Sequence, residues 1–315
     1  MPSDTAHTDL AAQTCVIVLT LNAQRYMPGL LDAIARLRHA PARVLFVDSS
    51  SDDATVALAT AAGHSAHVIR RAEFGHGRTR NQAAALCTDC RFMVFLTQDA
   101  CPQGEDWLSC LLEPFSDQRV ALVYGRQLPR PEADGPERYA RLFNYPDRSD
   151  RSDVGDLVRR GIKAVFCSNS FSAYRTEAFH AVGGFPERLP LGEDMAVALR
   201  LLQKGHARVY QPRACAVHSH AYSVVEELRR YFDIGTLMSM DAELRRVRLA
   251  ASGEGLRFLR GELASAWNPR RPQSAVRVIL RAGAKYVGFS LGQRYELLPL
   301  AWRRRLSMHS FFWSQ

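Results

Sequence analysis

Residues 92–100, Phe-Met-Val-Phe-Leu-Thr-Gln-Asp-Ala, decide the fold of this chain. Their first five residues are apolar, the run stops at Thr97, Gln98 and Asp99, and Cys101-Pro102 closes it. A short apolar run bounded by breakers is typical of a strand buried on both faces of a parallel sheet. Open α/β sheets bind ligands at the carboxyl ends of their strands, so we expect Asp99 to face that crevice. A carboxylate there suits a divalent cation, although an Asp in this position also commonly caps the next turn.

Strands and helices alternate ahead of this run. We expect strands at 15–21, 43–47, 67–70 and 92–96, with helices at 28–38, 54–62 and 82–86. This alternation predicts an α/β fold, a Rossmann-like and mostly parallel sheet with right-handed crossovers and flanking helices. The residues after the first strand contain neither GxGxxG nor GxxxxGK[ST], so we expect neither a dinucleotide site nor a P-loop.

Polar residues follow each of these strands. The carboxyl ends of parallel strands meet at one edge of a sheet, so side chains that follow different strands should lie close together. One polar strand exit is an ordinary cap, but several at one edge indicate a binding site. The residues in question are Thr20, Asn22, Asp48, Gln98 and Asp99, with Arg78 and Arg80 in the segment before the central strand.

The composition is that of a globular protein. A length of 315 residues, with 47% hydrophobic and 23% charged residues, fits one large α/β domain or a domain with an appendage. The first 14 residues lack the basic start and apolar core of a signal peptide, and no stretch approaches the roughly 20 apolar residues of a membrane-spanning helix. The seven cysteines are scattered, with a single CxxC at Cys87–Cys90, so we expect reduced thiols in the cytoplasm and no zinc site.

Positive charge is concentrated in the last third of the chain. Residues 223–315 hold 15 Arg and one Lys against eight Asp and Glu, a net +8, which leaves +1 of the total +9 for the first 222 residues. We expect amphipathic helices at 226–243, 256–267 and 275–291. A partner of negative charge should therefore be sought in this region.

We expect that partner to be an anionic membrane surface. Arg277, Arg281 and Lys285 are four residues apart and should share a helix face, and Arg303–Arg305 lie near aromatic residues at the end of the chain. An interface in a homo-oligomer and an ordinary solvated face are the alternatives. No nucleic-acid-binding module is recognisable, so we do not expect nucleic acid as a partner.

Four segments resemble one enzyme family. They are TLNAQRY (20–26), FVDSSSDDAT (46–55), FGHGRTRNQAA (74–84) and FLTQDA (95–100). Together they resemble the donor half of the inverting, family-two glycosyltransferases of the GT-A fold. The sequences FGHGRTRN and LTQDA resemble those of bacterial rhamnosyltransferases that use dTDP-rhamnose. The resemblance covers residues 14–222 and implies a GT-A glycosyltransferase domain there. We expect a flexible N-terminus at 1–13 and a basic amphipathic helical region at 223–315.

The resemblance implies roles for the residues at the strand ends. Thr20 and Asn22 would line the base and ribose pocket, Asp48 would accept a hydrogen bond from a pyrimidine N3–H, and Arg80 would reach the base carbonyl or the diphosphate. Asp99 matches the second Asp of the family's Asp-x-Asp and would bind Mg²⁺ or Mn²⁺. Thr97 stands where the first Asp is expected, which leaves Gln98 as a substitute.

The second half of the chain supplies the remaining candidates. Asn169 and Ser170 would contact the donor sugar or the acceptor. Glu193 and Asp194 open a helix, where acids are favoured by the helix dipole. The resemblance makes Asp194 the general base and Glu193 a neighbouring substrate-binding residue.

A histidine completes the expected metal site. By position, His218 resembles the family's third metal ligand. His220 follows two residues later on an extended segment, where side chains alternate, so we expect only one of the two histidines to bind the metal. The polar segment 129–161 is expected to be a loop, either over the acceptor site or on the surface.

The resemblance implies inverting transfer of a sugar, L-rhamnose in first place, from a nucleotide-sugar donor. The acceptor would be a glycan or lipid-linked saccharide in cell-surface polysaccharide synthesis, at the inner face of the cytoplasmic membrane. The alternatives are a transferase of another UDP- or dTDP-sugar, a nucleotidyltransferase, and a non-catalytic nucleotide- or glycan-binding protein. A nucleotidyltransferase usually has a Gly-rich basic loop after its first strand, and LTLNAQRY is not one.

Overall fold

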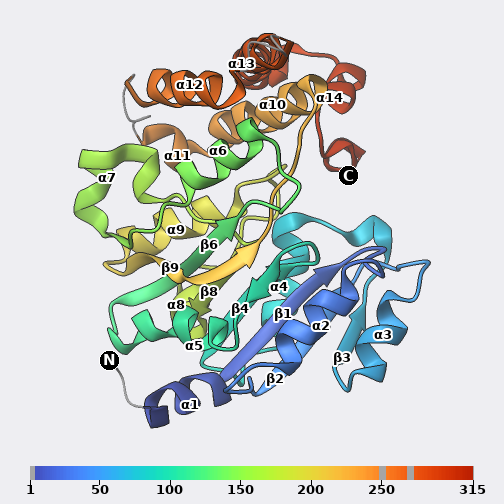
Figure 1. Cartoon of the computed structure of the whole chain (residues 1–315), viewed down its shortest axis with the longest axis vertical. Helices are drawn as coiled ribbons and strands as arrows, with labels where there is room; N and C mark the ends of the chain where they lie inside the picture. Colours follow the sequence, from blue (N-terminus) through green and yellow to red (C-terminus); the bar gives the residue numbers. More distant parts are fainter. Residues whose placement is uncertain (1–3, 248–252, 268–272, 315) are drawn as a thin grey trace.

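The structure, a computed structural model, describes residues 4–247, 253–267 and 273–314 (Figure 1). The described residues form one nine-stranded sheet in the order β3-β2-β1-β4-β8-β6-β9-β5, with β7 paired to β9. Helices pack on the sheet, and a group of C-terminal helices lies at one end of the molecule (Figure 1). The strands are β1 (Thr14–Thr20), β2 (Arg43–Asp48), β3 (Ser65–Val68), β4 (Phe92–Thr97), β5 (Cys101–Gln103), β6 (Val120–Leu128), β7 (Asp150–Ser152), β8 (Phe171–Arg175) and β9 (Ala207–Val217).

The central strand is buried as the sequence predicts. Met93 and Phe95 of β4 pack into the core on one face, while Phe92, Val94 and Leu96 pack into the core on the other. The expected crossover helices are present as α2 (Met27–Ala35), α3 (Thr55–Ala61) and α4 (His76–Ala85). Helix α4 begins at His76, so the FGHGRTRN segment is largely helical rather than a loop before a helix at residue 82.

The sheet is mixed: the four strands expected from the sequence are parallel to one another, and antiparallel pairs involve the later strands. The pairs β1–β2, β1–β4, β2–β3 and β6–β9 are parallel, whereas β4–β8, β6–β8, β5–β9 and β7–β9 are antiparallel. The reason is the path of the chain after β6. It stays at the carboxyl edge, where the amide of Thr97 donates to the carbonyl of Ser170 (3.3 Å), and β8 therefore starts where β4 ends.

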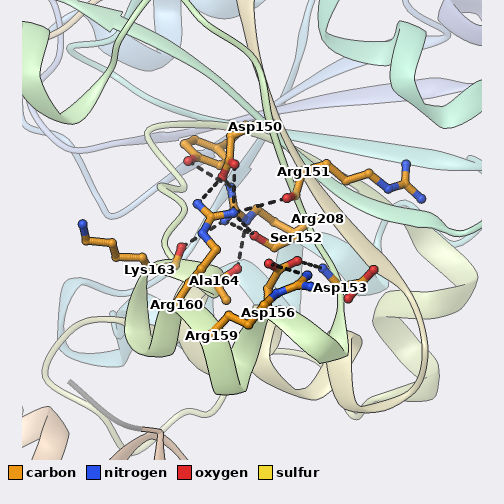
Figure 2. A network of polar contacts seen from close by, with 11 residues as sticks. Asp150, Arg151, Ser152, Asp153, Asp156, Arg159, Arg160, Lys163, Ala164 and Arg208 are labelled. Atoms are coloured by element: carbon orange, nitrogen blue, oxygen red, sulfur yellow. Dashed lines mark hydrogen bonds and ion pairs between the residues drawn. The ribbon is translucent and has the colours of Figure 1, made fainter. Parts of the chain in front are cut away.

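The segment 129–161 is folded, which corrects the expectation of a loop. It contains α6 (Gly135–Asn144), β7 and α7 (Val154–Arg160), and Asp134 and Asp153 cap the two helices through their side chains. Figure 2 shows what anchors it: buried Arg208 of β9 bonds to Asp150 (3.0 Å) and Ser152 (2.7 Å). Arg160 pairs with the same Asp150 at 2.7 Å. Ionic contacts hold β7 and α7, while Tyr139 and Phe143 of α6 pack on Phe258 of α12 (Gly253–Ala266). These partners lie far away in the sequence, so local hydrophobic periodicity could not reveal them.

Helices form most of the C-terminal region, as expected. They are α10 (Val224–Met240), α11 (Ala242–Arg246), α12 (Gly253–Ala266), α13 (Gln273–Gly292) and α14 (Leu300–Leu306). Helices α10 and α13 pack closely because glycines face the partner backbone: a Cβ on Gly288 would lie 2.2 Å from the Leu228 carbonyl oxygen. Among the described residues, no helix has the length and apolar character needed to cross a membrane.

The expectation that α13 presents an exposed basic face is wrong. Arg281 is only 7% exposed and pairs with Glu227 at 2.8 Å. Lys285 lies 3.5 Å from the same Glu227 and 3.9 Å from Glu262. These two cations point inward because α10 and α12 place carboxylates between the helices. The exposed side of α13 is instead largely apolar, formed by Val276, Ile279, Leu280, Tyr286 and Val287.

Both ends of the chain are also structured. Residues Asp4–Ala12 form α1, with Ala11 buried, where we expected a flexible N-terminus. Near the C-terminus, Phe311 packs edge-on against Phe74 with ring centroids 5.3 Å apart. A ring nitrogen of His309 lies 3.3 Å from one of His76. The C-terminal region therefore contacts the FGHGRTRN segment directly.

Candidate active site

The exits of β1, β2 and β4 lie together and are bonded to one another. The Thr20 hydroxyl donates to Asp48 Oδ2 (2.8 Å), and the Ser51 amide donates to Asp48 Oδ1 (2.7 Å). Asn22 adopts a left-handed conformation (φ 49°), and its side-chain oxygen accepts from the Asp52 amide (2.9 Å). The structure thus brings these predicted base- and ribose-binding residues to one edge, with Asp48 itself fully buried.

Gln98 joins the same edge. Its Oε1 accepts from the Leu21 amide (2.7 Å) and its Nε2 donates to the Leu21 carbonyl (3.1 Å). Both ends of the amide are therefore engaged by the backbone that leaves β1. We expected Gln98 to replace the missing carboxylate at position 97, but in this structure it ties two strand exits together.

A potential metal site lies at Asp99. Asp99 Oδ1 is 3.5 Å from His218 Nε2, Asp99 Oδ2 is 3.4 Å from His220 Nε2, and the two Nε2 atoms are 3.1 Å apart. One ligand atom from each of these three residues, the Asp-His-His triad, lies within 4.8 Å of the others. The expectation that only one histidine would face the site is wrong. Strand β9 ends at Val217, so the alternation of a strand does not govern residues 218–220.

Gln127 orients the triad. Its Oε1 lies 2.9 Å from His218 Nδ1, so His218 donates through Nδ1, and Nε2 faces Asp99 and His220 either with a proton or, once that proton is lost to make room for a metal, with its lone pair. Burial raises the pKa of Asp99, but the hydrogen bond from His218 and the charges of both histidines outweigh it and hold that pKa below its usual value. Burial and the neighbouring His218 lower the pKa of His220 to about 4. The triad therefore offers one ionised oxygen ligand and imidazole nitrogen, which fits a divalent cation.

A pair of carboxylates begins α9 (Glu193–Gln203) beside this site. Gly192 precedes them with a φ of 79°, and a Cβ there would lie 2.3 Å from Leu237 Cδ2 of α10, so only glycine fits the turn. Glu193 is 6% exposed and lies 3.1 Å from both Arg80 Nη1 and Asn169 Nδ2. Asp194 is half-buried and accepts from the amides of Asn169 (3.1 Å) and Met195 (2.8 Å).

The two carboxylates differ in their proton affinity. Burial raises the pKa of Asp194 to about 7, and the adjacent negative charge of Glu193 contributes. Burial acts in the same direction on Glu193, but Arg80 and His76 outweigh it and lower its pKa. In acid–base sites, one carboxyl group commonly has a raised pKa and its neighbour a lowered one, as in this pair. Asp194 is the member that is accessible and suited to accept a proton near neutral pH.

The side chains of Asn169 and Arg80 contact the carboxylate of Glu193. Asn169 Oδ1 accepts from Ser172 (3.0 Å) and Tyr174 (2.8 Å), and one N–H of its Nδ2 donates to Glu193, so its oxygen is fully engaged and one N–H remains. Arg80 also donates to the His76 carbonyl (3.0 Å) and is buried. Both side chains therefore contact Glu193, and the ligand contacts expected of them from the sequence stay predictions.

Two open cavities lie away from these groups. One, of about 780 Å³, is lined by residues such as Leu37 and His64, and the other, of about 660 Å³, by residues such as Cys90 and Glu177. Both adjoin the amino ends of parallel strands, and neither is lined by a predicted site residue. Ligand binding in open α/β sheets occurs at the opposite edge, where the triad and Asp194 lie.

Comparisons with known proteins agree with this arrangement. The family model described as glycosyl transferase family 2 matches residues 15–183. The chain belongs to this family. It is 38% identical over 306 residues to the O-antigen chain rhamnosyltransferase RfbN of Salmonella typhimurium, covering 95% of each chain. It is also 38% identical over 288 residues to the O-antigen chain rhamnosyltransferase WbaN of Salmonella anatum, covering 90% of this chain and 89% of the other.

Solved structures show the same fold. The mannosyltransferase PcManGT of Pyrobaculum calidifontis, in complex with GDP-Man and Mn²⁺, superposes with a TM-score of 0.56 at 17% identity, covering 96% of this chain and 86% of that one. Residues 1–349 of S. aureus TarS, in complex with UDP-GlcNAc, give a TM-score of 0.54 at 14% identity, covering 90% and 92%. The predicted GT-A fold and glycosyltransferase class of this family 2 enzyme are thus confirmed.

Sequence reasoning missed Gln127 and the convergence of His220. Gln127 lies near the end of β6, beyond the apolar run 120–124 that marks this strand in the sequence, so it is not among the polar strand exits named above. A longer strand would have placed it at the same edge as Asp99. His220 faces the site because β9 ends before the histidines, and nothing in the sequence marks that end.

Proposed function

We propose that this family 2 glycosyltransferase transfers L-rhamnose from dTDP-L-rhamnose, with inversion, onto a glycan or lipid-linked saccharide during cell-surface polysaccharide synthesis. The named relatives that match most of the chain support the sugar and the process. The single observation that carries the chemistry is the link between the two halves of the site. Asn169 bonds to Asp194, and the next residue, Ser170, bonds to Thr97, two positions before Asp99.

The triad of Asp99, His218 and His220 is proposed to hold Mn²⁺ in preference to Mg²⁺. Mg²⁺ strongly prefers an octahedron of oxygen ligands, and two imidazoles are a poor match for it. A divalent cation bound there would neutralise charge that develops on the leaving diphosphate. The ionised Asp99 supplies the negative charge of the ligand set, and Gln127 keeps His218 in the tautomer that binds through Nε2.

Asp194 is proposed to be the general base. It removes the proton from the acceptor hydroxyl as that oxygen attacks the anomeric carbon, and the bond from that carbon to the diphosphate oxygen breaks on the opposite side of the ring. One displacement inverts the anomeric centre and requires no covalent sugar on the protein. Glu193 remains paired with Arg80, which fixes the first turn of α9 and keeps Asp194 in place.

The donor is tested by hydrolysis, in which water replaces the unidentified acceptor. The purified chain is incubated with dTDP-L-rhamnose, dTDP-D-glucose, UDP-glucose and GDP-mannose, each with Mn²⁺, Mg²⁺ or EDTA, and release of the nucleotide is measured. We expect the fastest release from dTDP-L-rhamnose with Mn²⁺ and the slowest with EDTA. Equal rates with all four donors would contradict the assigned sugar, and no release from any donor would favour a binding protein.

We also propose that the exposed apolar face of α13 contacts an anionic membrane surface. Val276, Ile279, Leu280, Tyr286 and Val287 recur at helical spacing and are each 46–76% exposed. The exposed Arg277 lies beside them, and the C-terminal region carries a net +8. An apolar face beside an exposed Arg, in a region of net positive charge, fits a bilayer that contains anionic lipid better than it fits a second protein surface.

Flotation with liposomes tests this contact. Ile279→Asp combined with Leu280→Asp should abolish flotation on phosphatidylglycerol vesicles. Val158→Asp on α7, which replaces an 87% exposed apolar side chain elsewhere, should not. Unchanged flotation of the Ile279/Leu280 variant would contradict the proposal. A shift of the wild type to dimers without lipid, lost in this variant, would assign the face to self-association instead.

A further inference from the structure

Two arginines converge on the triad from outside the strands. Arg141 of α6 donates to Gln127 Oε1, the same oxygen that orients His218. Arg230 of α10 lies over the ring of Tyr222, 5.2 Å from its centroid. Tyr222 in turn stacks on His220, with centroids 5.3 Å apart. The two chains of contacts therefore meet at His218 and His220, whose Nε2 atoms are 3.1 Å apart.

Neither guanidinium is neutralised by a carboxylate. Among the residues that the structure describes, Arg141 and Arg230 have no ion-pair partner, and Arg230 has no hydrogen bond at all. Burial lowers the pKa of Arg141, and the charge of Arg230 lowers it further, so the two cations repel each other. Both are half-buried; burial also acts to lower the pKa of Arg230, but the neighbouring Tyr222, Tyr231 and Glu227 outweigh it and raise that pKa.

The acidic residues nearest to these arginines already have partners. Glu137, one turn before Arg141, pairs with Arg130 at 3.2 Å and also accepts from Ser219. Glu227 of α10 pairs with Arg281 and Lys285. Glu226 accepts from the amide of Ser223 (2.8 Å) as part of a capping box. None of these three carboxylates therefore forms an ion pair with Arg141 or Arg230.

The pair also lies near the proposed base. Tyr145 stacks under Arg141, 5.4 Å from ring centroid to guanidinium, and it is close enough to Arg141, Arg230 and Asp194 for all three charges to act on its hydroxyl. A ligand held by the arginines would thus reach toward both the triad and Asp194. Guanidinium groups bind phosphate oxygens through paired N–H donors, and two of them suit a diphosphate.

We propose that Arg141 and Arg230 form a binding site for a phosphate-bearing ligand beside the triad. This extends the proposed function, in which two ligands carry such a group: the nucleotide diphosphate of the donor and the phosphate of a lipid-linked acceptor. The shared chemistry is a phosphate oxyanion. Its negative charge replaces the repulsion between the two cations with attraction, which neither Glu137 nor Glu227 is free to provide.

The site is tested by direct binding in EDTA, without sugar transfer. Inorganic pyrophosphate is titrated into the wild type, Arg230→Gln and Arg141→Gln by calorimetry. Loss of one charge-assisted contact should weaken binding about 10- to 100-fold in each variant. Arg229→Gln is the matched control, because it removes a charge from the same helix at a side chain whose hydrogen bond, among the described residues, goes to the Arg305 carbonyl. Arg230→Lys keeps the charge without the paired donors and should be intermediate.

Two further probes identify the source of the phosphate. If the variants weaken dTDP and leave farnesyl diphosphate unchanged, the site holds the donor's diphosphate. If they weaken farnesyl diphosphate and leave dTDP unchanged, it holds a lipid-linked acceptor. Wild-type affinity of both variants for all three probes would overturn the proposal, as would an equal loss in Arg229→Gln. These outcomes are independent of whether dTDP-L-rhamnose is the substrate, because no turnover is measured.

Discussion

Replacing Gln127 with leucine should weaken metal binding without removing a metal ligand. The change deletes the oxygen 2.9 Å from His218 Nδ1, so the imidazole loses the contact that fixes its tautomer and orientation. Loss of such a supporting contact typically lowers metal affinity about 10- to 100-fold. At a Mn²⁺ concentration 100 times the wild-type Kd, the wild type gains about 2.7 kcal/mol of stability, and the variant should gain only about 0.4–1.4 kcal/mol.

The assay is thermal or urea unfolding of each protein with and without Mn²⁺. Only the increment that the metal adds is compared, so any general destabilisation by the substitution cancels. Gln127→Glu keeps an acceptor oxygen for His218 and should retain the increment. Gln211→Leu removes a buried glutamine of β9 that bonds to Glu113 and should leave the increment unchanged. The reasoning is refuted if Gln127→Leu gains as much from Mn²⁺ as the wild type while Asp99→Asn gains nothing.

Two further predictions concern the carboxylate pair and the buried ion cluster. Because the charge of Glu193 helps to raise the pKa of Asp194 to about 7, Glu193→Gln should lower that pKa. The acid limb of the pH profile for dTDP release should then move down by about one pH unit, and an unmoved limb would contradict the coupling. Arg208→Met should lower the free energy of unfolding by about 2–6 kcal/mol, because it removes the buried donor to the carbonyls of Lys163 and Ala164, at about 1–3 kcal/mol each, and leaves Asp150 paired with Arg160. In urea titrations the exposed Arg151→Met should show a much smaller loss, and equal midpoints for the two variants would argue against the cluster as the anchor of residues 150–160.

The parts of the fold predicted from the sequence are those governed by local apolar pattern. The strand at 92–96, the helix at Glu193 and the helices after residue 223 were each marked by hydrophobic spacing, and each is present. The antiparallel direction of β8 could not be predicted from the apolar pattern, because that direction depends on where the preceding segment lies. The folded segment 129–161 was missed for the related reason that its partners, Arg208 for β7 and Phe258 for α6, lie far away in the sequence.

The candidate site divides in a similar way. Asp99, His218 and Asp194 could be proposed from position and resemblance, and the structure places them with compatible partners. The resemblance could not tell that Arg80 and Asn169 are used by Glu193, because hydrogen-bond partners depend on three-dimensional packing. The same limit applies to Arg281 and Lys285, whose helical spacing was right but whose side chains turn inward to Glu227.

The central claim is that Asp194 is the base of a sugar transfer in which Asp99 and its histidines bind the cation. The most direct measurement is dTDP release from dTDP-L-rhamnose by Asp194→Asn at saturating Mn²⁺, with donor binding measured in parallel. The asparagine keeps the shape of the side chain but cannot take a proton. We predict a loss of about 10²- to 10⁴-fold in kcat with donor affinity unchanged, and a smaller loss for Glu193→Gln. Near wild-type release by Asp194→Asn, together with an inactive Glu193→Gln, would contradict the account.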